Sequence, residues 1–308
     1  MEEWTKQIMQ EIETQYENMF SNALVIAGPT ASGKTALAAE IAAEIGAEIV
    51  CADAFQIYRG LAVLTAQPSV EELKAVPHYL VGVLEPEEKF NASRFAALAN
   101  ERIAEIASRG RMALVVGGAG FYLQTLFGGT IAPQPDPSLR KELAQLSKEE
   151  LQERLRISDP DAFARIDLQN PRRVQRALEV VLTTGKPFAS FAAKSSTDVR
   201  GFVLQLAREE LFAKINVRTE HMLENGAIEE VARLLNGRQV SETCEATIGF
   251  REIRRLLRGE ISRSECLAAI QLATRRYAKR QETWFRNQTK WQRIQPGDLR
   301  SAIARLFL

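Results

Sequence analysis

The sequence has few cysteines and histidines, and neither type is arranged in a recognisable pair. The cysteines are Cys51, Cys244 and Cys266, an odd number without a CxxC spacing, which fits no disulfide framework. The histidines, His78 and His221, have no cluster of acidic residues or cysteines around them. These absences argue against a zinc site and favour a reduced, cytosolic setting.

Long hydrophobic runs are also absent. No stretch approaches the roughly 18 uninterrupted apolar residues of a membrane span, and the N-terminus lacks the basic-then-apolar pattern of a signal peptide. Residues 1–21 instead predict a polar, acidic helical extension. We therefore expect a cytoplasmic protein without a membrane partner, and we expect a monomer.

Charge of one sign is not in excess. The chain has 40 Lys and Arg against 39 Asp and Glu, a net charge of +1. This balance argues against a strongly basic nucleic-acid binder as a whole. It leaves room for a local basic patch, because binding depends on where the charge lies.

Short apolar runs alternate with helical patterns in the first half of the chain. Such near-continuous runs are typical of strands buried on both faces, and their alternation with helices predicts an α/β fold with a parallel sheet. The predicted strands are 23–27, 48–52, 79–83, 113–116 and 202–207, and the clearest predicted helices are 35–45 and 92–109.

The character of the sequence changes in its middle. Pro133, Pro135 and Pro137 mark a linker, and the charge-rich stretches that follow are helical, without a strand candidate. We expect an all-helical insertion domain at 131–189. The α/β core would then consist of 22–130 and 190–308, with an almost wholly helical C-terminal part.

A glycine-rich segment after the first predicted strand matches the phosphate-binding P-loop. The segment GPTASGKT fits G-x4-G-K-[ST] and opens a predicted helix, which is the context that the motif requires. Its backbone N–H groups and the helix N-terminus would face phosphate oxygens, Lys34 would reach the phosphates, and Thr35 could ligate Mg²⁺. The predicted residues for binding a di- or triphosphate are Gly28, Pro29, Thr30, Ala31, Ser32, Gly33, Lys34 and Thr35. A glycine-rich turn without a ligand is the alternative, and the loop alone does not define a reaction.

Two further segments follow predicted strands, and ligands bind at the carboxyl ends of such strands. Asp53–Arg59 comes after the second strand, and Gly117–Tyr122 comes after the fourth. The carboxylate of Asp53 could hold Mg²⁺ or act as a general base beside bound phosphates. Its alternative role is that of a helix N-cap.

The motifs in combination resemble the tRNA dimethylallyltransferases (tRNA isopentenyltransferases) of the bacterial type. The resemblance extends over roughly residues 22–290, and its combination of motifs is more selective than the P-loop alone. The motifs are GPTASGKT at 28–35, DAFQIYRG at 53–60, TAQP at 65–68, VPHYL at 76–80, VGGAGFYL at 116–123, NPRRVQRALEV at 170–180, TGKP at 184–187, ATIGFREI at 246–253 and ATRRYAKRQETWFR at 273–286.

This resemblance implies a nucleotide-kinase-like P-loop NTPase core that binds dimethylallyl diphosphate where a kinase would bind ATP, with Mg²⁺ as cofactor. It implies transfer of the dimethylallyl group to N6 of adenosine 37, directly 3′ of the anticodon, in the anticodon stem-loop of tRNA. The adenine would be flipped out of its stack to reach the buried diphosphate.

The resemblance also implies roles for single residues. Asp53 would be the general base, with Lys34 and Thr35 as its catalytic partners at the diphosphate. Arg218 would bind the diphosphate, and Gln56 would read the adenine edge. The implied tRNA contacts are Asp53, Ala54, Phe55, Gln56 and Ala119, together with Arg172, Arg173, Val174, Gln175 and Arg176 of the insertion.

The predicted C-terminal helix at 275–286 mixes basic and aromatic residues. Arg276, Lys279, Arg280 and Thr283 share one face at helical spacing. RNA is recognised by basic groups on phosphates and by planar groups on unstacked bases. The alternative is a basic helix face that is simply solvated. The resemblance favours tRNA binding by Arg276, Lys279 and Arg280. In either case Trp284 is expected to pack in the core.

Four positions depart from the family pattern. Ala119 stands where GGTG has threonine, and Ala54 stands where serine is common. In the segment matching GTAKP, Leu64 replaces glycine and Gln67 replaces lysine. From the resemblance, we expect the missing hydroxyl at Ala119 to affect positioning of the tRNA and the base, and the missing charge at Gln67 to weaken RNA contact.

Three other functions stay open at this point. A small-molecule P-loop kinase would use Arg172–Arg176 as lid arginines over ATP. An adenylate dimethylallyltransferase would share the donor and the loop without needing the basic C-terminal helix. A non-catalytic RNA-binding relative is suggested by Ala119.

Overall fold

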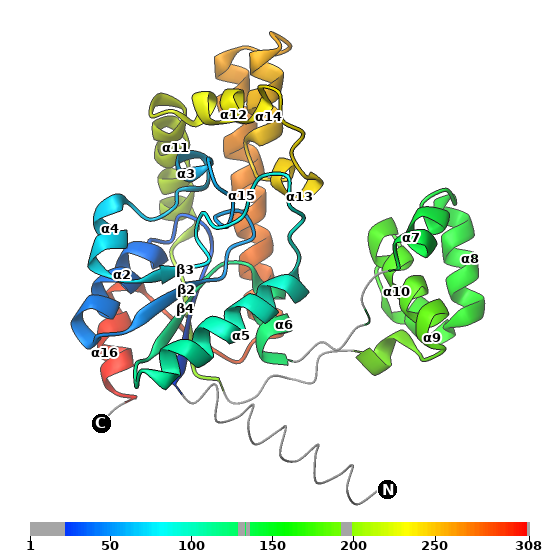
Figure 1. The fold of residues 1–308 in the computed structure, drawn as a ribbon, viewed down its shortest axis with the longest axis horizontal. Coiled ribbons are helices and arrows are strands. Elements are labelled where there is room, and N and C mark those ends of the chain that lie inside the picture. Colours follow the sequence, from blue (N-terminus) through cyan, green and yellow to red (C-terminus); the bar gives the residue numbers. More distant parts are fainter. Residues whose placement is uncertain (1–21, 129–132, 134–135, 192–198, 307–308) are drawn as a thin grey trace, which may run out of the picture. The chain divides into compact units, whose positions relative to one another are not determined.

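A parallel β-sheet forms the centre of the larger of two compact units (Figure 1). The structure is a computed structural model and describes residues 22–128, 133, 136–191 and 199–306. The first unit consists of Met1–Phe127 and Thr197–Leu308, and the second of Gly128–Ser196. The predicted helix at 1–21 lies outside the described residues.

The sheet has the order β3-β2-β4-β1-β5-β6, and every neighbouring pair is parallel. The predicted α/β class with a parallel sheet is confirmed. The strands are β1 (Ala23–Ala27), β2 (Glu48–Cys51), β3 (His78–Tyr79), β4 (Ala113–Gly117), β5 (Gly201–Leu204) and β6 (Gln292–Ile294). The helices of this unit are α2 (Lys34–Ile45), α3 (Ala62–Thr65), α4 (Val70–Ala75), α5 (Ala92–Ser108), α6 (Gly120–Gly128), α11 (Arg208–Glu224), α12 (Ala227–Leu235), α13 (Glu242–Glu245), α14 (Phe250–Leu257), α15 (Arg263–Gln288), η2 (Pro296–Asp298) and α16 (Leu299–Ala304).

Two strand predictions were wrong in detail. The strand expected at 79–83 ends at Tyr79, because Leu80 has a φ of 63° and turns the chain. Strand β6 was not predicted, since the C-terminal part was expected to be almost wholly helical. Its residues are mostly polar and exposed, as an edge strand allows, and backbone pairing with β5 rather than an apolar pattern places it in the sheet.

Alternating side chains of the central strands divide the core into two layers. In β1, Leu24 and Ile26 pack in the cluster that contains α2 and α16, whereas Val25 packs in the cluster that contains α5. A period of two along a strand produces this division. The loops that leave the carboxyl ends of β1, β2 and β4 are thereby held on a rigid, doubly covered sheet.

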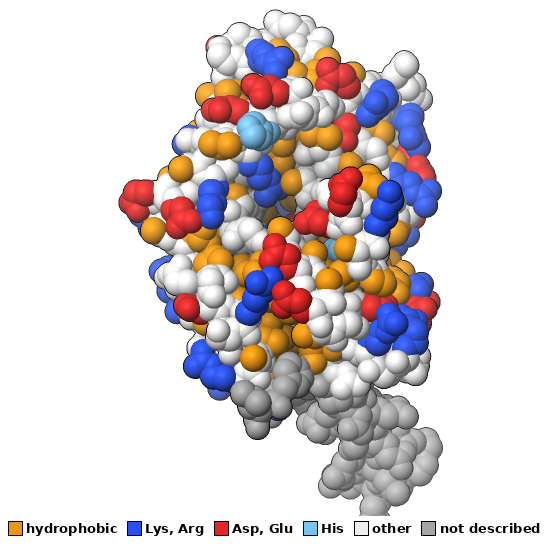
Figure 2. Space-filling view, turned by 90° about the vertical axis from the view of Figure 1, so that its left-hand side faces the viewer, with side chains coloured by type: hydrophobic (Ala, Val, Ile, Leu, Met, Phe, Trp, Pro, Cys, Tyr) orange, Lys and Arg blue, Asp and Glu red, His pale blue; other side chains and the backbone are white. Residues whose placement is uncertain are grey.

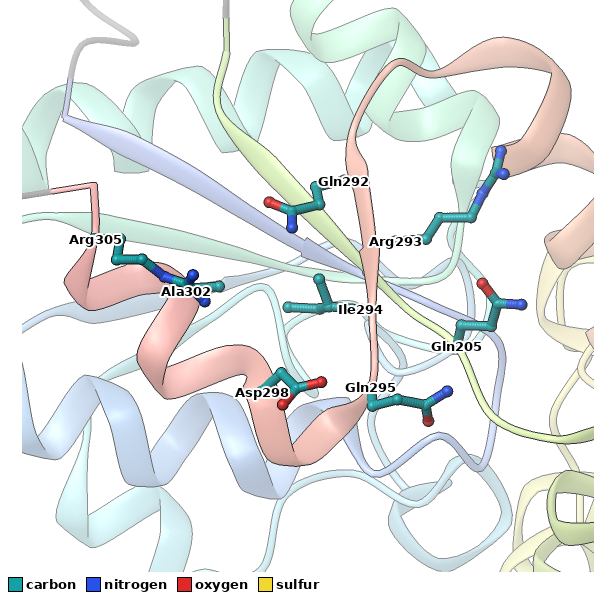
Figure 3. Close-up of a pocket in the computed structure, with 8 residues that line it drawn as sticks. All are labelled: Gln205, Gln292, Arg293, Ile294, Gln295, Asp298, Ala302 and Arg305. Carbon is teal, nitrogen blue, oxygen red and sulfur yellow. The ribbon is translucent and has the colours of Figure 1, made fainter.

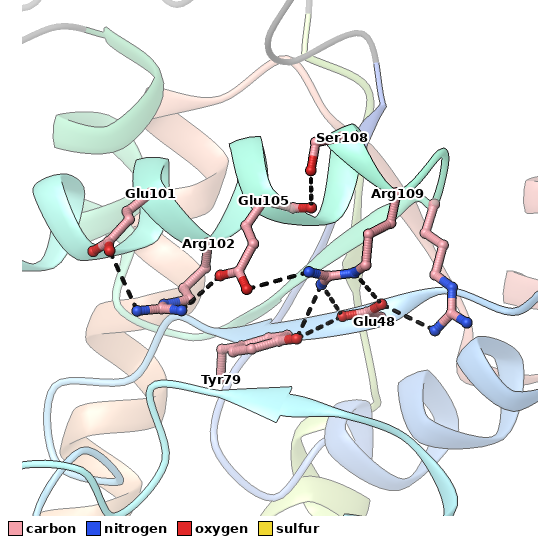
Figure 4. Close-up of polar contacts among 8 residues, drawn as sticks. Glu48, Tyr79, Glu101, Arg102, Glu105, Ser108 and Arg109 are labelled. Carbon is pink, nitrogen blue, oxygen red and sulfur yellow. Dashed lines mark hydrogen bonds and ion pairs between the residues drawn. The ribbon is translucent and has the colours of Figure 1, made fainter.

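A buried carboxylate fixes the opposite, amino end of the sheet. Glu48 begins β2, is 2% exposed, and pairs with Arg109 at 2.7 Å and with Arg111 at 3.0 Å. Tyr79 of β3 donates its hydroxyl to the same carboxylate at 2.7 Å (Figure 4). Burial raises the pKa of Glu48, but the hydrogen bonds from Arg109, Tyr79 and Arg111 outweigh it and hold the pKa below its usual value.

The second unit is helical over its described residues and has its own apolar core. Asn170 caps the start of α10 with its side chain, and Pro171 occupies the first helical position. Leu143, Leu155 and Val174 are fully buried in this core. Its elements are α7 (Pro137–Leu143), α8 (Lys148–Ser158), α9 (Pro160–Arg165), α10 (Pro171–Thr184) and η1 (Phe188–Phe191). Within the described ranges of both units, no helix has the length and apolar character that a membrane crossing demands.

Candidate active site

The P-loop connects β1 to α2, as its sequence predicted. Gly33 has φ 80° and ψ 6°, a left-handed conformation at the N-cap of α2. Ser32 is 2% exposed, and its hydroxyl has no hydrogen-bond partner within the described residues. An unsatisfied buried hydroxyl at the N-terminus of a helix fits an anionic ligand such as a phosphate oxygen.

Two partly buried cations lie at this loop. Arg218 of α11 donates from Nη1 to the hydroxyl of Thr30 at 3.3 Å, although the two residues are far apart in the sequence. Burial lowers the pKa of Lys34 to about 8; Asp53 opposes this shift, and Arg218 adds to it. Burial also lowers the pKa of Arg218, again opposed by Asp53. Desolvated cations of this kind favour an anion between them.

The carboxylate of Asp53 lies beside these cations and keeps one oxygen available. Its Oδ1 accepts from the backbone N–H groups of Phe55 at 2.9 Å and Gln56 at 3.3 Å. The capping role considered as an alternative is therefore present for this one oxygen. Its Oδ2 makes no hydrogen bond with any described residue, so it can accept a proton or bind a ligand.

A small cavity of about 60 Å³ opens between the P-loop, α11 and α15. Thr30, Asp53 and Arg218 give it a charged end, while Met222 and Ile248 contribute to an apolar wall. Figure 2 shows one face of the first unit, which is hollowed near its centre with both basic and acidic side chains around the hollow. A ligand with an anionic head and a short apolar chain matches this arrangement.

The segment after β2 is held by two glutamines. Gln56 is 8% exposed, and its Nε2 donates to the carbonyls of Thr65 at 3.1 Å and Ala66 at 2.8 Å. Gln67 donates from Nε2 to the carbonyls of Gln56 and Tyr58, both at 2.8 Å. Reading of the adenine edge by Gln56 stays a prediction, and its amide hydrogens are engaged by the backbone in this structure.

Sequence reasoning missed one residue of the site, Gln281. This side chain of α15 is 5% exposed; its Oε1 accepts from the N–H of Thr30 at 2.8 Å, and its Nε2 donates to the carbonyl of Gly118 at 2.9 Å. It thus connects the P-loop to the loop after β4. The sequence signal that could have identified Gln281 is its place in the ATRRYAKRQETWFR motif. Only the basic and aromatic residues of that motif were interpreted as functional.

The basic residues of α15 lie together at the surface. Arg276, Lys279, Arg280 and Thr283 line one hollow of about 530 Å³, which confirms that they share a helix face. Trp284 also lines this hollow and is only partly buried, so the expectation that it belongs to the core holds in part. The hollow offers cations beside an aromatic surface, a combination suited to nucleic acid.

The other predicted tRNA contacts divide between exposed and buried positions. In the second unit, Arg172 and Arg173 are exposed and make no ion pair with described residues, whereas Arg176 pairs with the buried Glu179 at 3.1 Å. Val174 is fully buried in that unit's core, so its side chain cannot contact RNA directly. In the first unit, Ala119 is 9% exposed.

The site residues fit a magnesium ion, provided that the ligand supplies most of the oxygens. No group of three or more His, Cys, Asp or Glu residues suited to a metal occurs in the described ranges. Mg²⁺ needs only one or two protein ligands when phosphate and water complete its shell. Thr35, at the start of α2, and Asp53 offer a hydroxyl and a carboxylate for this purpose.

Another hollow lies at the edge of the sheet, between β6 and α16. It is lined by Gln205 and Gln292–Gln295 among others, with a volume of about 300 Å³. Figure 3 shows its two arginines, Arg293 and Arg305, on opposite sides of β6 rather than converging on one point. Because charged groups do not converge there, this hollow is a weaker candidate than the cavity at Asp53.

Comparison with known proteins gives one consistent result. A family model described as IPP transferase matches residues 56–288. The chain is 44% identical over 270 residues to tRNA dimethylallyltransferase 1 of Citrifermentans bemidjiense, covering 85% of this chain and 88% of that protein. It is 42% identical over 287 residues to tRNA dimethylallyltransferase of Akkermansia muciniphila, covering 91% and 96%.

Solved structures agree with these relatives. A tRNA delta(2)-isopentenylpyrophosphate transferase from Staphylococcus epidermidis aligns with a TM-score of 0.65 at 32% identity, covering 89% of this chain and 93% of that one. A eukaryotic dimethylallyltransferase solved acting on tRNA aligns with a TM-score of 0.74 at 28% identity, covering 86% and 70%. The chain therefore belongs to the IPP transferase family, the family of the tRNA dimethylallyltransferases.

Proposed function

We propose that this protein transfers a dimethylallyl group from dimethylallyl diphosphate to N6 of adenosine 37 in the anticodon stem-loop of tRNA. The observation that carries the proposal is the pocket lined by Asp53 and Arg218, with Lys34 close enough to both to interact with them electrostatically. Family membership supports the choice of donor and acceptor. The enzyme acts in the cytoplasm, where tRNA is found, and as a monomer, because one chain supplies all three groups.

The cations of the pocket suit the departure of diphosphate. When the bond between C1 and the diphosphate oxygen breaks, the oxygen keeps the electron pair and negative charge develops on the leaving group. Lys34, Arg218 and the P-loop amides are fixed donors that stabilise this charge. Mg²⁺ bound through Thr35 would supply further positive charge at the same place.

The free oxygen of Asp53 suits the acceptor. The exocyclic amine of adenine is a weak nucleophile, so its position and the removal of its proton both matter. As N6 forms the new bond to C1, Asp53 Oδ2 accepts the proton that N6 loses. No water has to attack, which separates this chemistry from hydrolysis.

Two basic surfaces would bind the RNA. The hollow on α15 offers Arg276, Lys279 and Arg280 to phosphates and Trp284 to a base. In the second unit, Arg172 and Arg173 are exposed cations available to the backbone of the stem. Replacing either set of cations by alanine should weaken tRNA binding in a salt-dependent manner without changing affinity for diphosphate.

The test is incubation with labelled dimethylallyl diphosphate and unmodified tRNA, followed by nucleoside analysis. The expected product is N6-(dimethylallyl)adenosine, and Asp53→Asn should lower kcat by about 100- to 10,000-fold while tRNA binding is kept. Near-normal turnover by Asp53→Asn would remove Asp53 from the role of base. Transfer to AMP but not to tRNA would indicate an adenylate dimethylallyltransferase, and ATP turnover with a small acceptor would indicate a kinase.

A further inference from the structure

The cavity beside Asp53 has a charged end at the P-loop and apolar side chains further along its wall. Arg218 at its charged end contacts Thr30 of the P-loop, and Met222, which also lines the cavity, lies one turn further along α11. Four residues of helix span about 6 Å. Leu64 and Ile248 also line the cavity, so a chain attached to a diphosphate at the P-loop would meet apolar side chains past Arg218.

Besides Thr30, four threonines line the cavity, and the hydroxyls of three of them are satisfied. The hydroxyls of Thr65, Thr219 and Thr274 each donate to the backbone carbonyl four residues earlier, at 2.6, 2.8 and 2.8 Å. The hydroxyl of Thr247 has no hydrogen-bond partner within the described residues, although Thr247 is only 4% exposed.

An unsatisfied hydroxyl in an apolar wall is costly. Burying such a group without a partner disfavours folding, and most buried polar atoms in proteins have one. Thr247 comes from the same loop as Ile248, at the apolar part of the wall, and both residues line the cavity. The missing partner is therefore expected on the ligand, at the end of its chain that is remote from the diphosphate.

We propose that Thr247 is a specificity-determining residue that binds a terminal hydroxyl on the prenyl chain, so that the enzyme accepts hydroxylated five-carbon prenyl diphosphates as donors. This inference rests on the proposed function. The transfer itself is unchanged: the bond from C1 to the diphosphate oxygen breaks, N6 bonds to C1, and Asp53 receives the proton. The chain hydroxyl does not react and is retained in the product.

The experiment compares 4-hydroxy-3-methylbut-2-enyl diphosphate, with each geometric isomer supplied separately, against dimethylallyl diphosphate, with tRNA as acceptor. The measured quantity is the ratio of kcat/KM for the hydroxylated and plain donors, obtained by nucleoside analysis of competition reactions. The variants are Thr247→Val, which replaces the hydroxyl by a methyl group, and Thr247→Ser, which keeps the hydroxyl. Thr219→Val is the matched control, because it removes a hydroxyl that is already bonded to its own helix.

The wild type is expected to use at least one isomer, and Thr247→Val should lower the ratio for that isomer by about 3- to 10-fold, the effect of one neutral hydrogen bond. Turnover of dimethylallyl diphosphate should be kept in that variant. Thr247→Ser and Thr219→Val should leave the ratio unchanged.

An unchanged ratio in Thr247→Val, with both isomers, would overturn the inference and leave the hydroxyl to an ordered water. Rejection of both isomers by the wild type, with dimethylallyl transfer intact, would overturn it as well. Transfer of neither donor to tRNA would instead contradict the proposed function. Thermal unfolding of each variant, measured alongside, shows whether a loss of both activities reflects unfolding. If Thr247→Val unfolds, the ratio in Thr247→Ala, which is smaller and also lacks the hydroxyl, decides.

Discussion

The two glycine-rich loops at the site use glycine for different physical reasons. In the P-loop, Gly33 has a φ of 80°, and a Cβ placed there would meet nothing within 4 Å. In the loop after β4, Gly118 has no unusual φ, but a Cβ there would lie 2.1 Å from Nε2 of Gln281 and 3.0 Å from the carbonyl oxygen of Gly28. The first glycine is required by backbone conformation and the second by close approach.

This difference shows how the site is assembled. The P-loop is a local structure, and its backbone conformation directs N–H groups and Lys34 toward a phosphate. The loop after β4 acts through its neighbours, since Gln281 fits between Gly118 and Thr30 and joins the two loops. A substitution in the first loop should therefore change the ligand site, and one in the second should also change packing.

If the conformation of the P-loop serves to place Lys34 at a phosphate, replacing Lys34 should have the largest effect. Lys34→Met should lower kcat by about 100- to 1,000-fold, because it removes one preorganised positive group from the leaving diphosphate. Stability should be kept, since the buried cation is replaced by an apolar chain of similar length. Steady-state transfer and thermal unfolding measure both effects; turnover within tenfold of the wild type would contradict the assumption.

The close approach at Gly118 gives the next largest effect. Gly118→Ala should destabilise the fold by about 1–3 kcal/mol through overpacking and should also weaken donor binding, because Gln281 must move. Chemical denaturation and the donor Kd measure the two results. Gly297→Ala is the control, as a Cβ there meets nothing within 4 Å and the φ is not in the left-handed region.

A double variant sharpens this prediction. Gln281→Ala removes the side chain that a Cβ at position 118 would meet, so the stability loss of Gly118→Ala should be smaller in that background. Strict additivity of the two substitutions would show that the clash with Gln281 is not what Gly118 avoids.

The conformational role of Gly33 predicts a smaller change. Gly33→Ala should cost about 1–2 kcal/mol of stability, the penalty of a left-handed conformation for a residue with a Cβ, and should weaken diphosphate binding. Gly110→Ala has a similar φ of 69° with nothing within 4 Å, so it should lose comparable stability without affecting the ligand. Calorimetry with inorganic diphosphate separates the two variants, and equal diphosphate affinities would remove Gly33 from the ligand site.

The pKa of Lys34 gives the smallest predicted effect. With this pKa lowered to about 8 in the free protein, Lys34 is charged below pH 8 and loses its proton as the pH rises through 8. Diphosphate binding favours the charged form, so affinity should be steady from pH 7 to 8 and then fall by up to about tenfold per pH unit. Lys34→Arg, which stays charged, should abolish this dependence; a pH-independent affinity in the wild type would contradict the lowered pKa.

Much of the first unit could be predicted because its signals are local. An apolar run predicts a buried strand, and GPTASGKT after such a run predicts the loop, its N–H groups and Lys34. Strand β6 could not be predicted, because a polar edge strand is defined by pairing with β5 and has no pattern of its own. The role of Gln281 could not be predicted for a similar reason, since its partners, Thr30 and Gly118, are brought to it only by the fold.

By itself the sequence determined the parallel α/β class, the P-loop and the resemblance that named the family, because these depend on residue patterns that are short in sequence. Only the tertiary structure decided which cations share the site with Asp53, that Val174 packs inward, and that Thr247, unlike the other cavity threonines, has a hydroxyl without a partner among the described residues. Burial and hydrogen bonding between distant segments depend on where the chain returns in space, and that information is not local.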